Sequence, residues 1–177
     1  MNLVAAYRRL PGGLWPRIAV PAAGATHGLA VRWLLLAGFA GGLAEVAWIG
    51  VFTALTPLTA GNVLREITAT VAPALAGTAF APLLGLAIHF GLSALLGLAF
   101  GYALSSPALR AVGRPATYPV AVVLLIGTWA VNFLVLLPAL NPVFVGLMPM
   151  PVTLASKALF GVAMAATLQY SGARLRR

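Results

Sequence analysis

Four strongly polar side chains interrupt four otherwise apolar stretches of this 177-residue sequence, one in each stretch. They are Glu45, His89, Asn132 and Lys157. Ionisable groups inside a membrane usually pair with one another or line a cavity, so the set could hold a proton, an ion or a small anionic or quinone-like ligand. The alternative is a structural clasp, in which Glu45 and Lys157 neutralise each other and fix the register of the helices. Both interpretations require the four residues to meet at one depth.

The composition of the chain excludes a water-soluble fold. Hydrophobic residues make up 62% of the sequence and charged residues only 7%, whereas soluble domains carry about 25% charged residues. The absence of cysteine excludes disulfides, thiolate metal sites and cysteine-ligated iron–sulfur clusters. We therefore expect an all-α, polytopic integral membrane protein that forms a single membrane domain over residues 1–177.

Four apolar runs are long enough to cross about 30 Å of hydrocarbon, which takes about 20 helical residues. They cover about 33–55, 80–104, 118–137 and 152–170, and the third is expected to end before Pro138. These runs predict a four-transmembrane-helix bundle.

The segments outside the spans also have expected structures. Pro73 and Pro82 break the long apolar region before the second span, which leaves a short interfacial helix over about 62–71 with Asn62 as its N-cap. Residues 1–30 contain arginines and prolines that do not fit a signal peptide. We expect them to form a cytoplasmic interfacial arm, and residues 171–177 to form a basic cytoplasmic tail.

The arginines predict the orientation, because short loops rich in basic residues stay on the cytoplasmic side. Arginines cluster before the first span, between the second and third, and after the fourth. The interface-preferring aromatics at the same ends are Trp33, Tyr102, Tyr118 and Tyr170. Both termini are therefore predicted to be cytoplasmic. The excess of arginine over lysine, with abundant alanine, glycine and leucine, indicates a GC-rich bacterial genome and hence the inner membrane.

Counting along the helices places the four polar residues in one layer. At 1.5 Å per residue they lie about 18 to 22 Å from the cytoplasmic ends of their spans, just past the midplane towards the outside. Small residues spaced by about four predict which helix faces pack closely. The expected packing residues are Gly38, Gly41, Gly42, Gly85, Ser93, Gly97, Gly101 and Gly161.

Two further pairs could form sites. Arg65 and Glu66 are adjacent in the outer loop, and on a helix they point about 100° apart, so we expect them to contact different partners. Met148 and Met150 offer thioethers suited to Cu(I), but the spans contain a single histidine and no complete set of soft ligands. No metal site, haem or other cofactor is predicted.

The net charge of +9 raises the possibility of a nucleic-acid partner. It is divided among three juxtamembrane segments, however, so anionic lipid head groups are the expected partner and nucleic acid is not. No catalytic motif is present, and we expect no enzyme, with an intramembrane enzyme the least favoured option. The main hypothesis is a non-catalytic subunit, assembly factor or helper of a larger membrane complex, in contact with other membrane subunits or with itself. The alternative is a small proton-coupled, ion or small-molecule transporter that acts as an oligomer through Glu45, His89 and Lys157.

Overall fold

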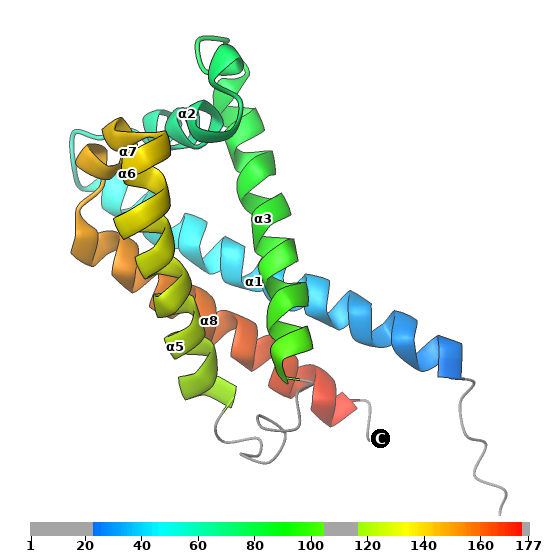
Figure 1. The fold of residues 1–177 in the computed structure, drawn as a ribbon. Coiled ribbons are helices and arrows are strands. Elements are labelled where there is room, and N and C mark those ends of the chain that lie inside the picture. Colours follow the sequence, from blue (N-terminus) through cyan, green and yellow to red (C-terminus); the bar gives the residue numbers. More distant parts are fainter. Residues whose placement is uncertain (1–22, 105–116, 175–177) are drawn as a thin grey trace, which may run out of the picture.

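A computed structural model describes residues 23–104 and 117–174 of the chain (Figure 1). These residues form helices joined by short turns, and four of the helices are long and apolar enough to cross a membrane. The membrane-length segments are Val31–Ala54, Ala81–Ala103, Tyr118–Leu140 and Met150–Ser171. The predicted all-helical, four-span fold is confirmed. Residues 1–22 of the expected N-terminal arm and residues 175–177 of the expected tail lie outside the described residues.

The spans are arranged around α1 (Ala23–Ala54), which packs against α3 (Ala81–Leu104) and α8 (Met150–Arg174). The remaining span starts with α5 (Thr117–Val131), which packs against α8. Among the described helices, α3 and α5 are not a closely packed pair. In Figure 1 they stand apart, with α1 and α8 running diagonally behind them. Because α1 begins at Ala23, the last part of the expected arm is the start of this helix.

Glycines bring neighbouring helices into backbone contact. Gly38 of α1 lies against the backbone carbonyl of Ser93 in α3, and Gly97 of α3 lies against the carbonyl of Leu34 in α1. A Cβ atom at either glycine would overlap the backbone of the other helix, so close approach of α1 and α3 depends on both. The structure places the other expected glycines at helix contacts too: Gly41 faces Phe160, Gly42 faces Ser93, Gly85 faces Leu64, Gly101 faces Leu34 and Gly161 faces Val122.

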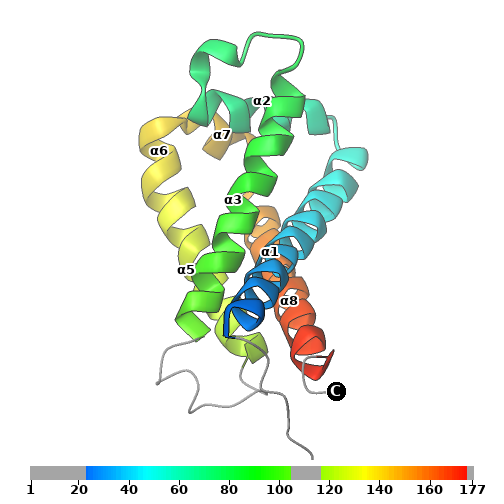
Figure 2. The same ribbon diagram turned by 90° about the vertical axis from the view of Figure 1, so that its right-hand side faces the viewer.

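One end of the bundle is covered by α2 (Ala60–Val71), which lies across the spans in Figures 1 and 2. Thr59 is its N-cap and accepts a hydrogen bond from the Asn62 amide at 3.2 Å, so the expected cap at Asn62 is wrong. The helix is attached to α3, because the buried Thr68 hydroxyl donates to the carbonyl of Ala81 at 2.6 Å. The 3₁₀ turn η2 (Pro73–Leu75) connects α2 to α3. We call this end of the bundle the capped end.

The third span was expected to end before Pro138, but it continues to Leu140. After α5, a single wide π-helical turn, η4 (Asn132–Leu136), leads into α6 (Leu137–Leu140). Pro138 has no backbone N–H, and in a regular α-helix its ring would collide with the carbonyl of Leu134. The wide turn, in which the Leu137 amide donates to the Asn132 carbonyl, accommodates the proline without ending the helix.

Two apolar clusters lie at different heights in the bundle. The cluster nearer the chain's C-terminus joins all four spans and consists of Ala37, Phe100, Ala121, Leu125, Phe160, Met164 and Ala165. The cluster at the capped end consists of Val63, Phe133, Leu137 and Met148, and it includes residues from α2 and from the turn after α7 (Pro142–Leu147). The candidate site adjoins the cluster at the capped end, whose four buried residues line it.

Candidate functional site

A cavity of about 730 Å³ lies among the four spans, beneath α2. Most of its lining is apolar, and the four polar residues of the expected layer all contribute to it: Glu45 from α1, His89 from α3, Asn132 from η4 and Lys157 from α8. Ligand sites in proteins commonly enclose about 300 to 1,000 Å³ and combine apolar walls with a few convergent polar groups. The cavity has both properties.

Glu45 and Lys157 form an ion pair in which Lys157 Nζ lies 2.7 Å from Glu45 Oε2. The side chains are only 13% and 14% exposed, so both charges are largely withdrawn from solvent. The hydroxyl of Ser156 lies 3.1 Å from Glu45 Oε1 and 2.7 Å from the Thr153 carbonyl, and its one hydrogen is shared between them. The ring of Phe160 lies 5.6 Å from Nζ and adds a cation–π contact.

His89 contacts the backbone of α1. Its Nε2 lies 3.1 Å from the carbonyl oxygen of Gly42, an atom that can only accept, so Nε2 carries the hydrogen. Gly42 makes this approach possible, because a Cβ atom there would lie 3.4 Å from His89 Nε2 and 2.5 Å from the Ser93 hydroxyl. Ser93 in turn donates to the His89 carbonyl at 2.8 Å. The ring is therefore held in one tautomer, which leaves Nδ1 as an acceptor when the imidazole is neutral.

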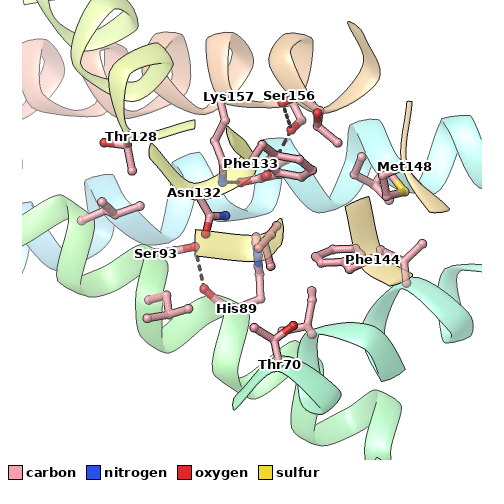
Figure 3. A pocket seen from close by; sticks show the side chains of 18 of the residues that line it. Thr70, His89, Ser93, Thr128, Asn132, Phe133, Phe144, Met148, Ser156 and Lys157 are labelled. Carbon is pink, nitrogen blue, oxygen red and sulfur yellow. Dashed lines mark hydrogen bonds and ion pairs between the residues drawn. The ribbon is translucent and has the colours of Figure 1, made fainter. Parts of the chain in front are cut away.

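Asn132 differs from the other three residues because its carboxamide has no hydrogen-bond partner among the described side chains and backbone groups. It is half-buried and is the first residue of the π-helical turn. Figure 3 shows Asn132 and Lys157 pointing towards each other and into the cavity, with His89 on the opposite wall. Residues at π-helical turns are frequently part of functional sites.

The four polar residues also lie at one height. At 1.5 Å per residue, each is about 10 to 14 Å from the end of its helix at the capped end. This depth agrees with the layer expected from the sequence.

The outer pair Arg65 and Glu66 contacts different partners and remains outside the cavity layer. Arg65 Nη1 donates to the carbonyls of Ala76 and Thr78 at 2.7 and 3.0 Å. Glu66 Oε2 accepts from Asn141 Nδ2 at 3.0 Å, while Asn141 Oδ1 caps α7 by accepting from the Phe144 amide at 3.2 Å. Asn141 therefore joins α2 to α7 at the capped end. The sequence signal that could have revealed it is an asparagine directly before Pro142, a typical helix start.

Sequence reasoning also missed the hydroxyl groups of α8. Ser156 contacts the ion pair, and Thr153 accepts from Trp129 Nε1 at 2.9 Å, which ties α8 to α5. Trp48 Nε1 of α1 donates to the Val152 carbonyl at 3.0 Å.

Met148 packs in the apolar cluster with Phe133 instead of facing outwards beside Met150.

Comparison with protein-family models, with curated proteins and with solved structures finds no match to this chain. Its function therefore has to be inferred from the geometry of the cavity. In the described part of the chain, no three His, Asp or Glu side chains are grouped closely enough to hold a metal ion. The polar groups that do meet offer hydrogen bonds to a molecule in an otherwise apolar cavity, which suits binding and orientation.

Proposed function

We propose that this chain is a non-catalytic membrane protein that holds a small amphiphilic molecule in its central cavity, as a subunit or helper of a larger membrane complex. The observation that carries the proposal is the 730 Å³ cavity into which each span contributes at least one polar residue. An amphiphile fits because apolar walls surround a single polar region.

A structural clasp alone accounts for less of the site. It explains the ion pair between Glu45 and Lys157, which could form equally well in a fully packed interior. It explains neither the size of the cavity nor Asn132, whose carboxamide has no partner in the described chain. The Asn132 amide atoms are accessible from the cavity, so a bound molecule can form hydrogen bonds with them.

The proposal includes an orientation in a bacterial inner membrane, with both termini in the cytoplasm. The aromatic belt supports it, since the rings of Trp33 and Tyr170 lie 6.3 Å apart, near the start of α1 and the end of α8, away from α2. Tyr102 and Tyr118 lie at the same ends of their spans. Arginines near this end would contact anionic head groups, at about 1 kcal/mol each. A reporter that is active only outside the cytoplasm, fused to the C-terminus, should be inactive, and one inserted between 55 and 60 should be active.

Retention of a bound molecule tests the central claim. The full chain is extracted in mild detergent, and native mass spectrometry measures any non-covalent adduct. Gly127 lines the cavity, and a Cβ atom added there would meet no other atom within 4 Å, so Gly127→Leu should reduce the cavity without straining a helix contact. Gly91 of α3 also has free space but does not line the cavity, so Gly91→Leu is the matched control.

We expect an adduct on the original chain and on Gly91→Leu, and a clear loss of it from Gly127→Leu. Absence of any adduct from the folded original chain would contradict the proposal. Equal retention by both variants would show that the bound molecule lies elsewhere. For the larger complex, gentle solubilisation should yield stoichiometric partners; purification as a free monomer, with no assembly defect on deletion, would contradict that part.

The second candidate is a small proton-coupled transporter, which the buried pair of Glu45 and Lys157 beside His89 favours. Ionisable groups at membrane depth mark proton and ion paths in many transporters. Flux of protons or of a small solute into liposomes should then disappear in the double variant Glu45→Gln, Lys157→Met. Flux that survives in this variant would exclude the mechanism.

A further inference from the structure

We propose that the bound amphiphile has one alkyl chain and an uncharged carbonyl head, and that it enters from the bilayer between α3 and α5. This inference rests on the proposed function and names the ligand class of the same cavity. Three observations support it: a lateral opening, hydrogen-bond donors at Lys157 and Asn132, and the charge balance around Lys157.

The opening is formed by residues that line the cavity and are nevertheless exposed on the outside of the bundle. On α3 these are Leu92 and Leu95, at 52% and 60% exposure, and on the third span they are Val131 and Leu136, at 54% and 47%. Helices α3 and α5 are not closely packed against each other in the described structure. This side of the cavity is at the depth of the hydrocarbon layer, so the molecule that reaches it comes from the lipid phase.

Two residues in the cavity offer N–H groups to a bound molecule, beside the acceptors at His89 Nδ1 and the Asn132 carboxamide oxygen. The Lys157 ammonium has three N–H groups, and one of them is directed to Glu45. The Asn132 carboxamide adds two N–H groups that contact no acceptor in the described chain. A head group that accepts hydrogen bonds, such as a carbonyl, satisfies both residues.

The charge of the site selects against an anionic head. Lys157 by itself would attract a carboxylate, but Glu45 already neutralises it at 2.7 Å. A second carboxylate would leave one net negative charge in a largely dehydrated site, and an uncompensated buried charge is strongly unfavourable. A neutral carbonyl takes up the free N–H groups and leaves the charge of the site balanced.

The size of the cavity accommodates the apolar part of the ligand. Its volume of about 730 Å³ lies in the range that holds one molecule of drug size. That volume suits one alkyl chain with its head group, and the apolar walls formed by residues such as Ile49, Val63 and Leu96 can contact the chain.

Two matched photoreactive probes test the head group. A 16-carbon fatty acid with a diazirine in its chain and the methyl ester of the same molecule are added to the full chain in phosphatidylcholine nanodiscs at pH 8. After irradiation, mass spectrometry measures how much of each probe is attached and to which peptides. We expect the ester to label the α3 and α5 peptides at least about fivefold more than the acid, because the acid would place a second, uncompensated carboxylate beside the neutralised pair. Equal or stronger labelling by the acid would overturn the inference.

Glu45→Gln provides the decisive comparison, because it removes the neutralising charge while leaving Lys157 in place. Its preference should reverse, with the acid labelling more than the ester. If this variant does not fold, Asn132→Leu keeps the ion pair and should lower ester labelling about fivefold, while a diazirine alkane without a head group labels as before. Unchanged ester labelling in Asn132→Leu would also refute the assigned head contact.

The outcomes separate this inference from the proposed function. If neither probe labels the cavity peptides more in the original chain than in Gly127→Leu, the cavity binds no amphiphile of this kind and the proposed function fails for these probes. If both probes label them equally and Gly127→Leu abolishes both signals, the cavity binds amphiphiles and only the neutral-head inference fails.

Discussion

The partnership of Glu45 and Lys157 makes a quantitative prediction for three variants. Glu45→Gln leaves the Lys157 ammonium without its counter-ion, and Lys157→Gln leaves the Glu45 carboxylate without its own. The double variant contains two neutral amides of similar size in the same positions. If the two residues act as a pair, the double variant should be much more stable than the sum of the single changes implies.

The structure sets the magnitude. Both side chains are at most 14% exposed and their charged atoms are 2.7 Å apart, so each charge is stabilised mainly by its partner and little by water. Removing one partner of such a pair costs about 3 to 5 kcal/mol, whereas replacing both is close to neutral. For a chain of this length, each kcal/mol lowers the melting temperature by about 2 to 4 °C, so each single variant should melt roughly 10 °C lower. The coupling energy, which is the difference between the double variant and the sum of the two single variants, should be about 6 kcal/mol or more.

Thermal unfolding in one detergent, followed by the change in helical circular dichroism, provides the measurement. Ser156→Ala is a useful control, because it removes only a neutral donor near Glu45 Oε1 and should cost about 1 kcal/mol. The reasoning is refuted if the two single variants are each nearly neutral. It is also refuted if their effects add in the double variant, because the two charges then do not stabilise each other.

Three further variants test other parts of the structure. Gly41→Leu places atoms against the Phe160 ring, where even a Cβ lies 2.5 Å away, so it should destabilise the protein by about 1 to 3 kcal/mol in the same unfolding assay. Gly50→Leu is the control, because a side chain there has free space and should cost little. Equal effects of the two variants would contradict the packing described for α1 and α8. Asn141→Ala removes the cap of α7 and the contact with Glu66, so it should cost about 1 kcal/mol of stability. It should also speed hydrogen exchange in residues 60–71. Unchanged exchange there would show that α2 is held by other contacts. Pro138→Ala should allow the wide turn to relax to α-helix, which raises the stability of the helix and turns Asn132 away from the cavity, so labelling by the ester probe should fall. A variant that gained both stability and ester labelling would contradict this prediction.

The sequence predicted the spans well because membrane length and hydropathy leave a strong one-dimensional signal. It also predicts a four-residue layer, since one polar side chain per span is easily counted from the helix ends, and all four residues line the cavity. The glycine faces followed from spacing alone, and Gly38 and Gly97 lie where that spacing put them.

Other features depend on relations that no local pattern records. The α-helix was expected to stop before Pro138, because a proline usually ends a helix, but a wider turn was a lower-cost solution here. His89 binds the Gly42 carbonyl instead of another polar side chain, and Ser156 reaches Glu45 only because α8 is rotated to present it. The cavity itself arises where α3 and α5 do not meet, and a missing contact has no sequence signature.

The wide turn at Asn132–Leu136 also changes how the third span responds to a change in chain length. A π-helical turn contains one residue more than an α-helical turn, so the helical segments on its two sides are related as they would be across a one-residue insertion. Deleting one residue within 132–136 together with Pro138→Ala should return the span to a continuous α-helix and leave both flanking segments facing their present neighbours. The same deletion in the middle of α3 would rotate one half of that helix by about 100° relative to the other and separate Gly85 or Gly97 from its contact. With Pro138 replaced by alanine, the third span can therefore lose a residue where the second cannot.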